Sequence, residues 1–163
     1  MAIRNDSLEP WIDRILTDAL RREMDARGSL ALVNDPKDAD LVLQGRVRPL
    51  IVRSRSFSSY AAALEYSVTM ALDVEIIRAS GIAMPLDATM LTETEVYLAS
   101  ADVETTRTHK TEALRRLSDL LASRIADSIE LMALPVVDGT ADAGAAGTAD
   151  AAADPKADAE EGA

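Results

Sequence analysis

The sequence predicts an α+β fold: a two-layer sandwich in which two long helices pack on one face of a mixed or antiparallel sheet of about four strands. Between Leu64 and Arg78, large apolar side chains recur at every second position. This period is typical of a strand with one buried and one exposed face. An amphipathic helical pattern lies on either side of this strand in the sequence, and two such helices can cover its apolar face.

Length and charge predict one domain with a tail. A chain of 163 residues that is 48% hydrophobic fits a single core. Residues 138–163 carry seven acids and one lysine among Ala, Gly, Thr and Pro, a composition that cannot offset the entropy of ordering. We therefore expect a single domain over residues 1–137 and a disordered acidic tail over 138–163. Residues 1–137 hold −5 of the total charge of −11, which argues against nucleic acid as a partner.

Several classes of protein are excluded by what the sequence lacks. The chain has no cysteine, so it has no disulfide, no thiol nucleophile and no cysteine-ligated metal. It also has no apolar run of 18 residues, so we expect no transmembrane helix. The first residues contain no apolar signal core. As written, the chain is expected to be soluble and to lack a signal.

The first helix is predicted to begin after Asp6 or Ser7, either of which can cap it, and to end at Gly28. Apolar residues recur at helical spacing within it, at Ile12, Ile15, Leu16, Ala19, Leu20 and Met24.

Two strands are predicted next. Leu30 to Val33 forms a short strand closed by the turn residues 34–36. Asp40 to Ser54 forms a longer one, in which Gly45 indicates a bulge and Pro49 indicates an edge position.

A serine-rich connection over residues 53–63, which contains Phe57 and Tyr60, leads into the long alternating strand. A turn at residues 81–85 then precedes another strand over residues 87–99. The last helix is predicted to begin at Asp102 or Thr105 and to end before Pro135.

One group of charges differs from the rest of the chain. Residues 41–64 contain no acid, whereas four arginines fall within ten residues: Arg46, Arg48, Arg53 and Arg55. Arg46 and Arg48 project from one face of a strand because they are two residues apart. The four side chains can form an anion-binding strip with Phe57 and Tyr60 at its rim. Alternatively, they protect an edge strand and pair across strands with Glu65, Asp73 or Glu75.

No catalytic residues, metal site or cofactor are predicted. His109 is the one histidine, without a second histidine or cysteine to share a metal, and we interpret it as a surface residue. Two pairs of acids share strand faces, Glu93 with Glu95 and Asp73 with Glu75. No aromatic pocket accompanies them, so we interpret them as the solvated face of a half-buried sheet. The sequence also lacks a phosphate-binding glycine loop and a nucleophile elbow, and we expect that the protein is not an enzyme.

Several segments, taken in order, resemble the lipopolysaccharide-assembly lipoprotein family, LptE. These are residues 4–10 (RNDSLEP), 16–23 (LTDALRRE), 39–47 (ADLVLQGRV), 65–68 (EYSV), 91–97 and the long final helix. The similarity extends over residues 3–133.

The resemblance implies a small lipoprotein at the periplasmic face of the outer membrane, lipid-anchored in its full-length form. Its implied partners are an LptD-type outer-membrane β-barrel that exports lipopolysaccharide, which it plugs and helps to assemble, and lipopolysaccharide itself. Lipopolysaccharide phosphates then become the expected ligand of Arg46, Arg48, Arg53 and Arg55, while Phe57 and Tyr60 become candidate contacts to the barrel. Members of the family begin with a signal peptide, a lipid-accepting cysteine and a first strand, and we expect most of these to be absent from the sequence as given.

Two other functions fit the same residues. One is a different periplasmic α/β lipoprotein that activates a cell-wall synthase. The other is a cytoplasmic α+β binding module that dimerises through an uncovered sheet edge.

Overall fold

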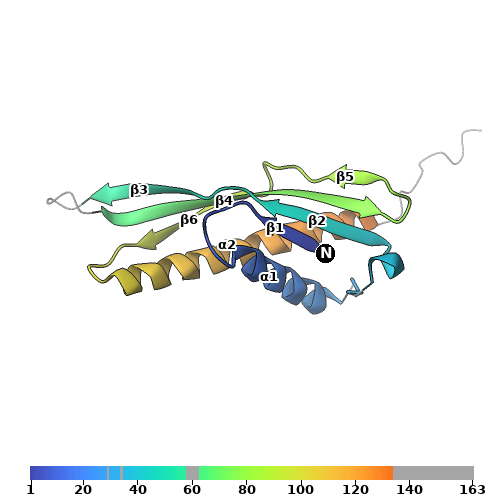
Figure 1. The fold of residues 1–163 in the computed structure, drawn as a ribbon, viewed down its shortest axis with the longest axis horizontal. Coiled ribbons are helices and arrows are strands. Elements are labelled where there is room, and N and C mark those ends of the chain that lie inside the picture. The colour runs from blue at the N-terminus through green and yellow to red at the C-terminus, as the bar shows by residue number, and fades with distance from the viewer. Residues whose placement is uncertain (29, 34, 58–62, 134–163) are drawn as a thin grey trace, which may run out of the picture.

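Two helices pack on one face of a six-stranded mixed sheet in the computed structural model, which describes residues 1–28, 30–33, 35–57 and 63–133 (Figure 1). The α+β architecture is as predicted, but the sheet has six strands rather than about four. The elements in chain order are β1 Ala2–Asn5, α1 Ile12–Arg27, the 3-10 turn η1 Pro36–Asp38, β2 Leu41–Val47, β3 Ile51–Phe57, β4 Ala63–Arg78, β5 Ala83–Pro85, β6 Thr92–Leu98 and α2 Val103–Ala133.

The long strand β4 is the axis of the sheet, because four strands pair with it in antiparallel register. On one edge, β2 pairs with residues 72–78 and β3 with residues 63–69. On the other edge, β6 pairs with residues 65–71 and β5 with residues 75–77. β1 adds a parallel strand beside β2. Strands that follow one another along β4, rather than side by side, make the molecule long and narrow (Figure 1).

The alternation of β4 determines where the core lies. Its even-numbered residues from Val68 to Ile76 are buried against the helices, whereas its odd-numbered residues lie on the opposite side, which we call the outer face. The helices contribute the other half of the core. Its buried helical residues include Ile12, Leu16, Leu20, Met24, Ala113, Leu114, Leu117, Leu121, Ile125 and Ile129.

The first helix begins later than predicted, at Ile12 rather than after Asp6 or Ser7. The hydroxyl of Ser7 does not cap it, because that hydroxyl donates to Asn5 Oδ1 at 2.7 Å and accepts from the backbone N–H of Glu9 at 3.2 Å. These bonds hold residues 5–9 in a non-helical turn, so the helix begins after it. The C-terminal end is as predicted: Gly28 has φ of 65° and donates its N–H to the carbonyl of Met24.

Residues 30–33 do not form the predicted strand; they follow α1 as irregular chain, and Leu30 packs against the core. The predicted strand over residues 40–54 is instead two strands, β2 and β3, separated by residues 48–50. Proline lacks the N–H that a ladder requires, so the strand is interrupted at Pro49. Pairing through Gly45 is regular, so the bulge predicted there is absent.

Arg27 links the C-terminal end of α1 to α2 through ion pairs. Its guanidinium donates to Asp127 at 2.6 Å and to Glu130 at 3.0 Å on α2, and to Glu23 at 2.8 Å on its own helix. The hydrogen bond to Asp127, followed by that to Glu23, raises the pKa of Arg27 above its ordinary value. Within the described part of the chain, no helix has the length and apolar character needed to cross a membrane.

Two neighbouring isoleucines test the division of β4 into faces. Ile76 is fully buried, whereas Ile77 is partly exposed on the outer face. We expect Ile76→Ala to lower the free energy of unfolding by about 2–5 kcal/mol because it leaves a cavity. Ile77→Ala should cost clearly less. Urea unfolding of the two variants measures this difference, and equal losses would contradict the assignment of the faces.

Asp102 caps α2, as one of the two predicted starts. Its carboxylate accepts from the backbone N–H of Thr105 at 3.0 Å and from the Thr105 hydroxyl at 2.6 Å. These bonds lower the pKa of Asp102 below its ordinary 3.8.

Because the folded pKa of Asp102 is lowered, the ionised cap stabilises the protein above that ordinary value and is lost as pH falls through the lowered one. We expect Asp102→Ala to lower the free energy of unfolding at about pH 7, with a smaller deficit near pH 3. Asp102→Asn keeps a cap acceptor without the charge and serves as control. Unfolding of all three proteins at both values is the measurement, and a deficit independent of pH would contradict this role.

Candidate functional site

The arginines predicted as a strip lie on β2 and β3, along one edge of β4. Arg46 is opposite Asp73, and the backbone N–H of Arg48 donates to the carbonyl of Ala71 at 3.0 Å. Arg53 is opposite Ser67. Since odd-numbered residues of β4 face outward, these three arginines lie on the outer face, away from the helices.

Arg53 reaches this face because of a one-residue bulge. An odd spacing of five residues from Arg48 would place Arg53 on the opposite face of a regular strand. Val47 is opposite Leu72 and Ile51 is opposite Thr69, so four steps along the β2–β3 side match three along β4. The extra residue, inserted at positions 48–50, returns Arg53 to the side of Arg48.

Arg46 is engaged in ion pairs with neighbouring carboxylates. Its guanidinium donates to Asp73 at 2.7 Å and lies 3.6 Å from Asp6, which in turn accepts from Arg4 at 2.9 Å. The hydrogen bond to Asp73 raises the pKa of Arg46 above its ordinary value. For Arg46, the structure therefore agrees with the cross-strand pairing that the sequence offered as an alternative to anion binding.

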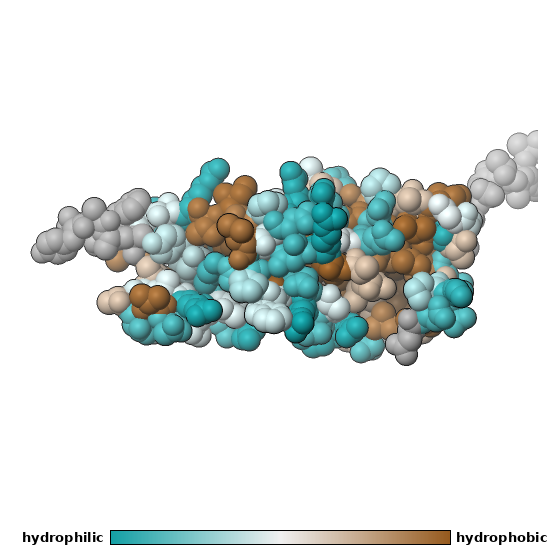
Figure 2. Space-filling model, viewed as in Figure 1, coloured by the Kyte–Doolittle hydropathy of each residue, from teal (hydrophilic) through white to brown (hydrophobic). Residues whose placement is uncertain are grey.

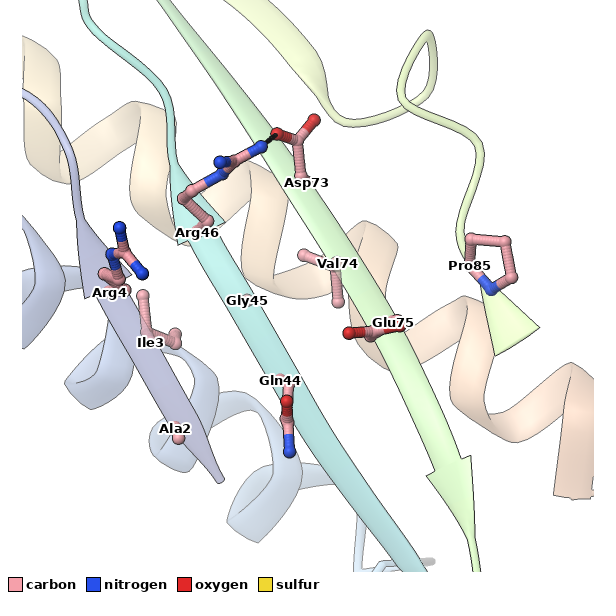
Figure 3. Close-up of a pocket in the computed structure, with 10 residues that line it drawn as sticks. All are labelled: Ala2, Ile3, Arg4, Gln44, Gly45, Arg46, Asp73, Val74, Glu75 and Pro85. Atoms are coloured by element: carbon pink, nitrogen blue, oxygen red, sulfur yellow. Dashed lines mark hydrogen bonds and ion pairs between the residues drawn. The ribbon is translucent and has the colours of Figure 1, made fainter. Parts of the chain in front are cut away.

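An open groove of about 550 Å³ surrounds this pair on the outer face (Figure 3). Figure 3 shows Arg46 on β2 directed toward Asp73 on β4, with Arg4 on the neighbouring β1. Gln44 and Glu75 line the same groove. Because its cations and carboxylates alternate and largely cancel, the groove does not concentrate positive charge.

Arg48 and Arg53 differ from Arg46 in having guanidinium groups that no described carboxylate pairs with. Both are exposed, and among the described residues neither forms an ion pair. Arg55 is also exposed and forms no ion pair with a described residue. It lies at a register shift between Ser54 and Ser56, so no residue of β4 is opposite it.

The acids of β6 are directed to the other face of the sheet. Glu93 and Glu95 are opposite Met70 and Val68, on the helix side. There Glu93 pairs with Arg124 at 2.9 Å and Glu95 with Arg116 at 2.7 Å, both from α2. The interpretation of these two acids as a solvated face is therefore wrong, because they connect the sheet to the helix.

Hydroxyl groups occupy the outer face between Glu65 and Asp73 of β4. Thr69 and Thr94 share a hydrogen bond of 2.7 Å, and Ser67 lies opposite Arg53. Among the described residues of β3, β4 and β6, no acid lies on this section of the outer face. We call Arg48, Arg53, Ser67, Thr69 and Thr94 the outer site.

The three hydroxyl residues of the outer site are not among the site residues predicted from the sequence. The signal was present in the alternation of residues 92–95, Thr-Glu-Thr-Glu, which places threonines on one face and glutamates on the other. Which face was which depended on the register with β4.

The other residues singled out from the sequence are the aromatic pair Phe57 and Tyr60 and the histidine His109. Phe57 is the last residue of β3, opposite Ala63, and its side chain lies outside the described part, as does the whole of Tyr60. His109 is partly buried, with Nδ1 3.0 Å from the carbonyl of Leu98. Within the described ranges, no group of His, Cys, Asp and Glu is arranged to hold a metal.

A protein-family model described as lipopolysaccharide-assembly, LptE, matches residues 1–129, which is most of the chain. The chain belongs to the LptE family. Membership makes it a lipopolysaccharide-assembly protein and agrees with the resemblance found in the sequence. A search of curated proteins found no match.

Solved structures are similar to this LptE family member in fold. The rare lipoprotein B from Shewanella oneidensis is 14% identical, with 81% of this chain and 96% of that chain covered and a TM-score of 0.55. A minor lipoprotein from Acinetobacter baumannii is 19% identical, with coverage of 80% and 93% and a TM-score of 0.47. At 14% identity, the similarity to the rare lipoprotein B supports the fold of two helices on one sheet and nothing further.

Proposed function

We propose that this LptE family member acts inside an LptD-type outer-membrane β-barrel that exports lipopolysaccharide, as a plug that supports barrel assembly and lipopolysaccharide insertion. In this proposal it works at the periplasmic face of the outer membrane, lipid-anchored in its full-length form, and catalyses no reaction. Family membership over residues 1–129 is the observation that carries the proposal. The narrow, elongated body suits insertion into a lumen (Figure 1).

The ligand proposed for the outer site is the phosphate of lipopolysaccharide. Arg48 and Arg53 present on one face guanidinium groups that form no ion pair within the described part of the chain. Guanidinium binds phosphate through charge-assisted, often bidentate hydrogen bonds. The hydroxyls of Ser67, Thr69 and Thr94 add neutral donors nearby. Among the described residues of these strands, no acid opposes an anion there.

The four arginines are not equal in this proposal. Arg48 and Arg53 bind the ligand, and Arg55 extends the same edge. Arg46 instead stabilises the pairing of β2 with β4 through Asp73. Phe57 and Tyr60 are proposed to contact the barrel. Residues 1–137 are proposed to form one domain, and residues 138–163 are proposed to act as a solubilising spacer that follows it.

Removing Arg48 and Arg53 should weaken lipopolysaccharide binding. A hydrogen bond to a charged group contributes about 1.5–3 kcal/mol net, so Arg48→Gln/Arg53→Gln should reduce affinity by about tenfold or more for each arginine that binds phosphate. Binding of the purified protein to fluorescently labelled lipopolysaccharide measures this. The affinity of the wild type should also fall with added salt.

Arg46→Gln/Asp73→Asn is the matched control, since it removes an arginine from the same strand edge together with the carboxylate that neutralises it and leaves the net charge unchanged. It should retain affinity close to that of the wild type. If this control weakens binding as much as Arg48→Gln/Arg53→Gln does, or if neither variant has an effect, the outer site is not the ligand site.

The proposed partner is tested by affinity purification of the tagged, full-length protein from detergent-solubilised outer membranes of its own cells. We expect the lipopolysaccharide-exporting barrel in near-equal amount, as measured by quantitative mass spectrometry. Recovery of a cell-wall synthase, or of a homodimer without a membrane partner, would instead support one of the two other functions considered from the sequence.

A further inference from the structure

A cavity of about 870 Å³ opens at the end of the molecule where α1 ends and β2 begins. Its walls come from the C-terminal ends of both helices, from residues 30–33, and from β2 and β4. Figure 2 shows apolar side chains around a hollow at this end of the molecule. The volume falls in the range of about 300–1,000 Å³ that is typical of sites for one small ligand.

The floor of the cavity is apolar and lies between the two layers of the fold. The buried side chains that line it come from the inner faces of the helices and of the sheet: Met24, Leu43, Ile76 and Ile129. The charged and hydroxyl side chains that line it are all exposed, so they lie at its mouth: Asp38, Asp40, Arg78 and Ser80. The cavity is therefore separate from the outer site, which is on the opposite face of the sheet.

The chain after α1 supplies an adaptable side wall. Residues 30–33, Leu-Ala-Leu-Val, have no regular secondary structure. Leu32 and Val33 line the cavity, yet they are 45% and 48% exposed. Met24 and Met132 line it as well, and methionine fills irregular space because its side chain is unbranched and flexible. Such walls can close around an apolar ligand without a fixed shape.

A hydrocarbon chain fits this lining better than a peptide does. The N–H and C=O groups of a peptide would lose their hydrogen bonds to water inside the cavity, and the side chains of its floor offer no polar group to replace them. A hydrocarbon chain needs no such partner, and its burial is favourable in proportion to the apolar area removed from water. The floor thus selects an aliphatic ligand.

The mouth of the cavity does not select an anionic headgroup. The guanidinium of Arg78 donates to the carbonyl of Met132 at 3.1 Å, which links the end of β4 to the end of α2. Asp38 and Asp40 line the same mouth with the opposite charge. Because charges of both signs are present, recognition depends on the chain inside the cavity rather than on a charged group outside it.

We propose that this cavity binds one acyl chain of lipopolysaccharide. The protein belongs to a lipopolysaccharide-assembly family, and the lipid part of lipopolysaccharide consists of acyl chains that carry no hydrogen-bonding group over most of their length. The inference rests on the proposed function in its choice of ligand, and it adds a second contact to that ligand. The outer site holds phosphate, and the cavity holds hydrocarbon.

Alkyl maltosides test the cavity with a hydrocarbon chain on an uncharged headgroup. Octyl, decyl and dodecyl maltoside, each below its critical micelle concentration, are titrated into the full chain with isotopically labelled methionine methyl groups. The methyl resonances of Met24 and Met132 should shift, whereas those of Met70 and Met90, outside the cavity, should not. Affinity should rise about fourfold for each added methylene, which corresponds to about 0.8 kcal/mol for each one buried.

Charges placed in the side wall should prevent this binding. Leu32→Asp/Val33→Asp should reduce the affinity for dodecyl maltoside at least about tenfold. Its melting temperature should stay close to that of the wild type, because both residues are exposed and outside regular secondary structure. Met90→Asp/Val103→Asp makes the same charge change at two exposed apolar side chains outside the cavity and should bind as the wild type does. If both variants lose affinity, or if neither does, the cavity is not the site.

Lipopolysaccharide and its chemically deacylated form identify the ligand. Intact lipopolysaccharide should shift the resonances of Met24 and Met132, and the deacylated form should not. Equal shifts with vesicles of phosphatidylethanolamine would overturn the choice of lipopolysaccharide. Tighter maltoside binding by a chain that ends at residue 133 would mean that residues 134–163 compete for the cavity, and would also overturn the proposal.

The two proposals fail separately. If no maltoside shifts the methyl resonances of Met24 and Met132, the acyl-chain site is wrong, while the proposed function stands as long as the tagged protein recovers the barrel. Failure to recover the barrel would reject the proposed function, and maltoside binding in the cavity would be unaffected.

Discussion

The burial of one face of β4 is the constraint on which the rest of this structure depends. Its even-numbered side chains, from Val68 to Ile76, form the layer against which both helices pack, while its backbone pairs with four other strands. A strand that is central and buried on one side only must present its other side chains to a different environment. The same alternation that builds the core therefore also creates the outer face, and any charge on the sheet is assigned to one side or the other.

The assignment of charge follows from register more than from the number of charges. On β6, Glu93 and Glu95 reach α2 and pair with its arginines, which removes acid from the outer face. On the opposite edge of β4, the extra residue near Pro49 returns Arg53 to the side of Arg48. A chain with net charge −11 thereby presents a surface on which the guanidinium groups of Arg48 and Arg53 form no ion pair with any described residue. Exposed ion pairs such as Arg46–Asp73 contribute little to stability, but this one decides which arginine is available to a ligand.

The β1–α1 connection shows a different use of local structure. Its hydrogen bonds through Asn5 and Ser7 replace the helical turn that the sequence around Ser7 favours, and they begin the helix at Trp11 in a conformation that tryptophan rarely adopts. Rigidity, backbone strain and exposed apolar area occur together there.

The sequence by itself determined the α+β class, the long strand from Leu64 to Arg78 and the helix end at Gly28, and it limited the start of the last helix to Asp102 or Thr105, because each depends on a local period or a local cap. It also located the four arginines and indicated the family. Only the tertiary structure decided that Arg46 is paired with Asp73, that Arg48 and Arg53 form no ion pair among the described residues, and that Ser67, Thr69 and Thr94 lie on the same face. It also placed the start of α1 at Ile12 rather than after Asp6 or Ser7, and it divided one predicted strand into two. These features depend on which residue lies opposite which across β4, and a shift of one residue exchanges the faces, so no local pattern can fix them.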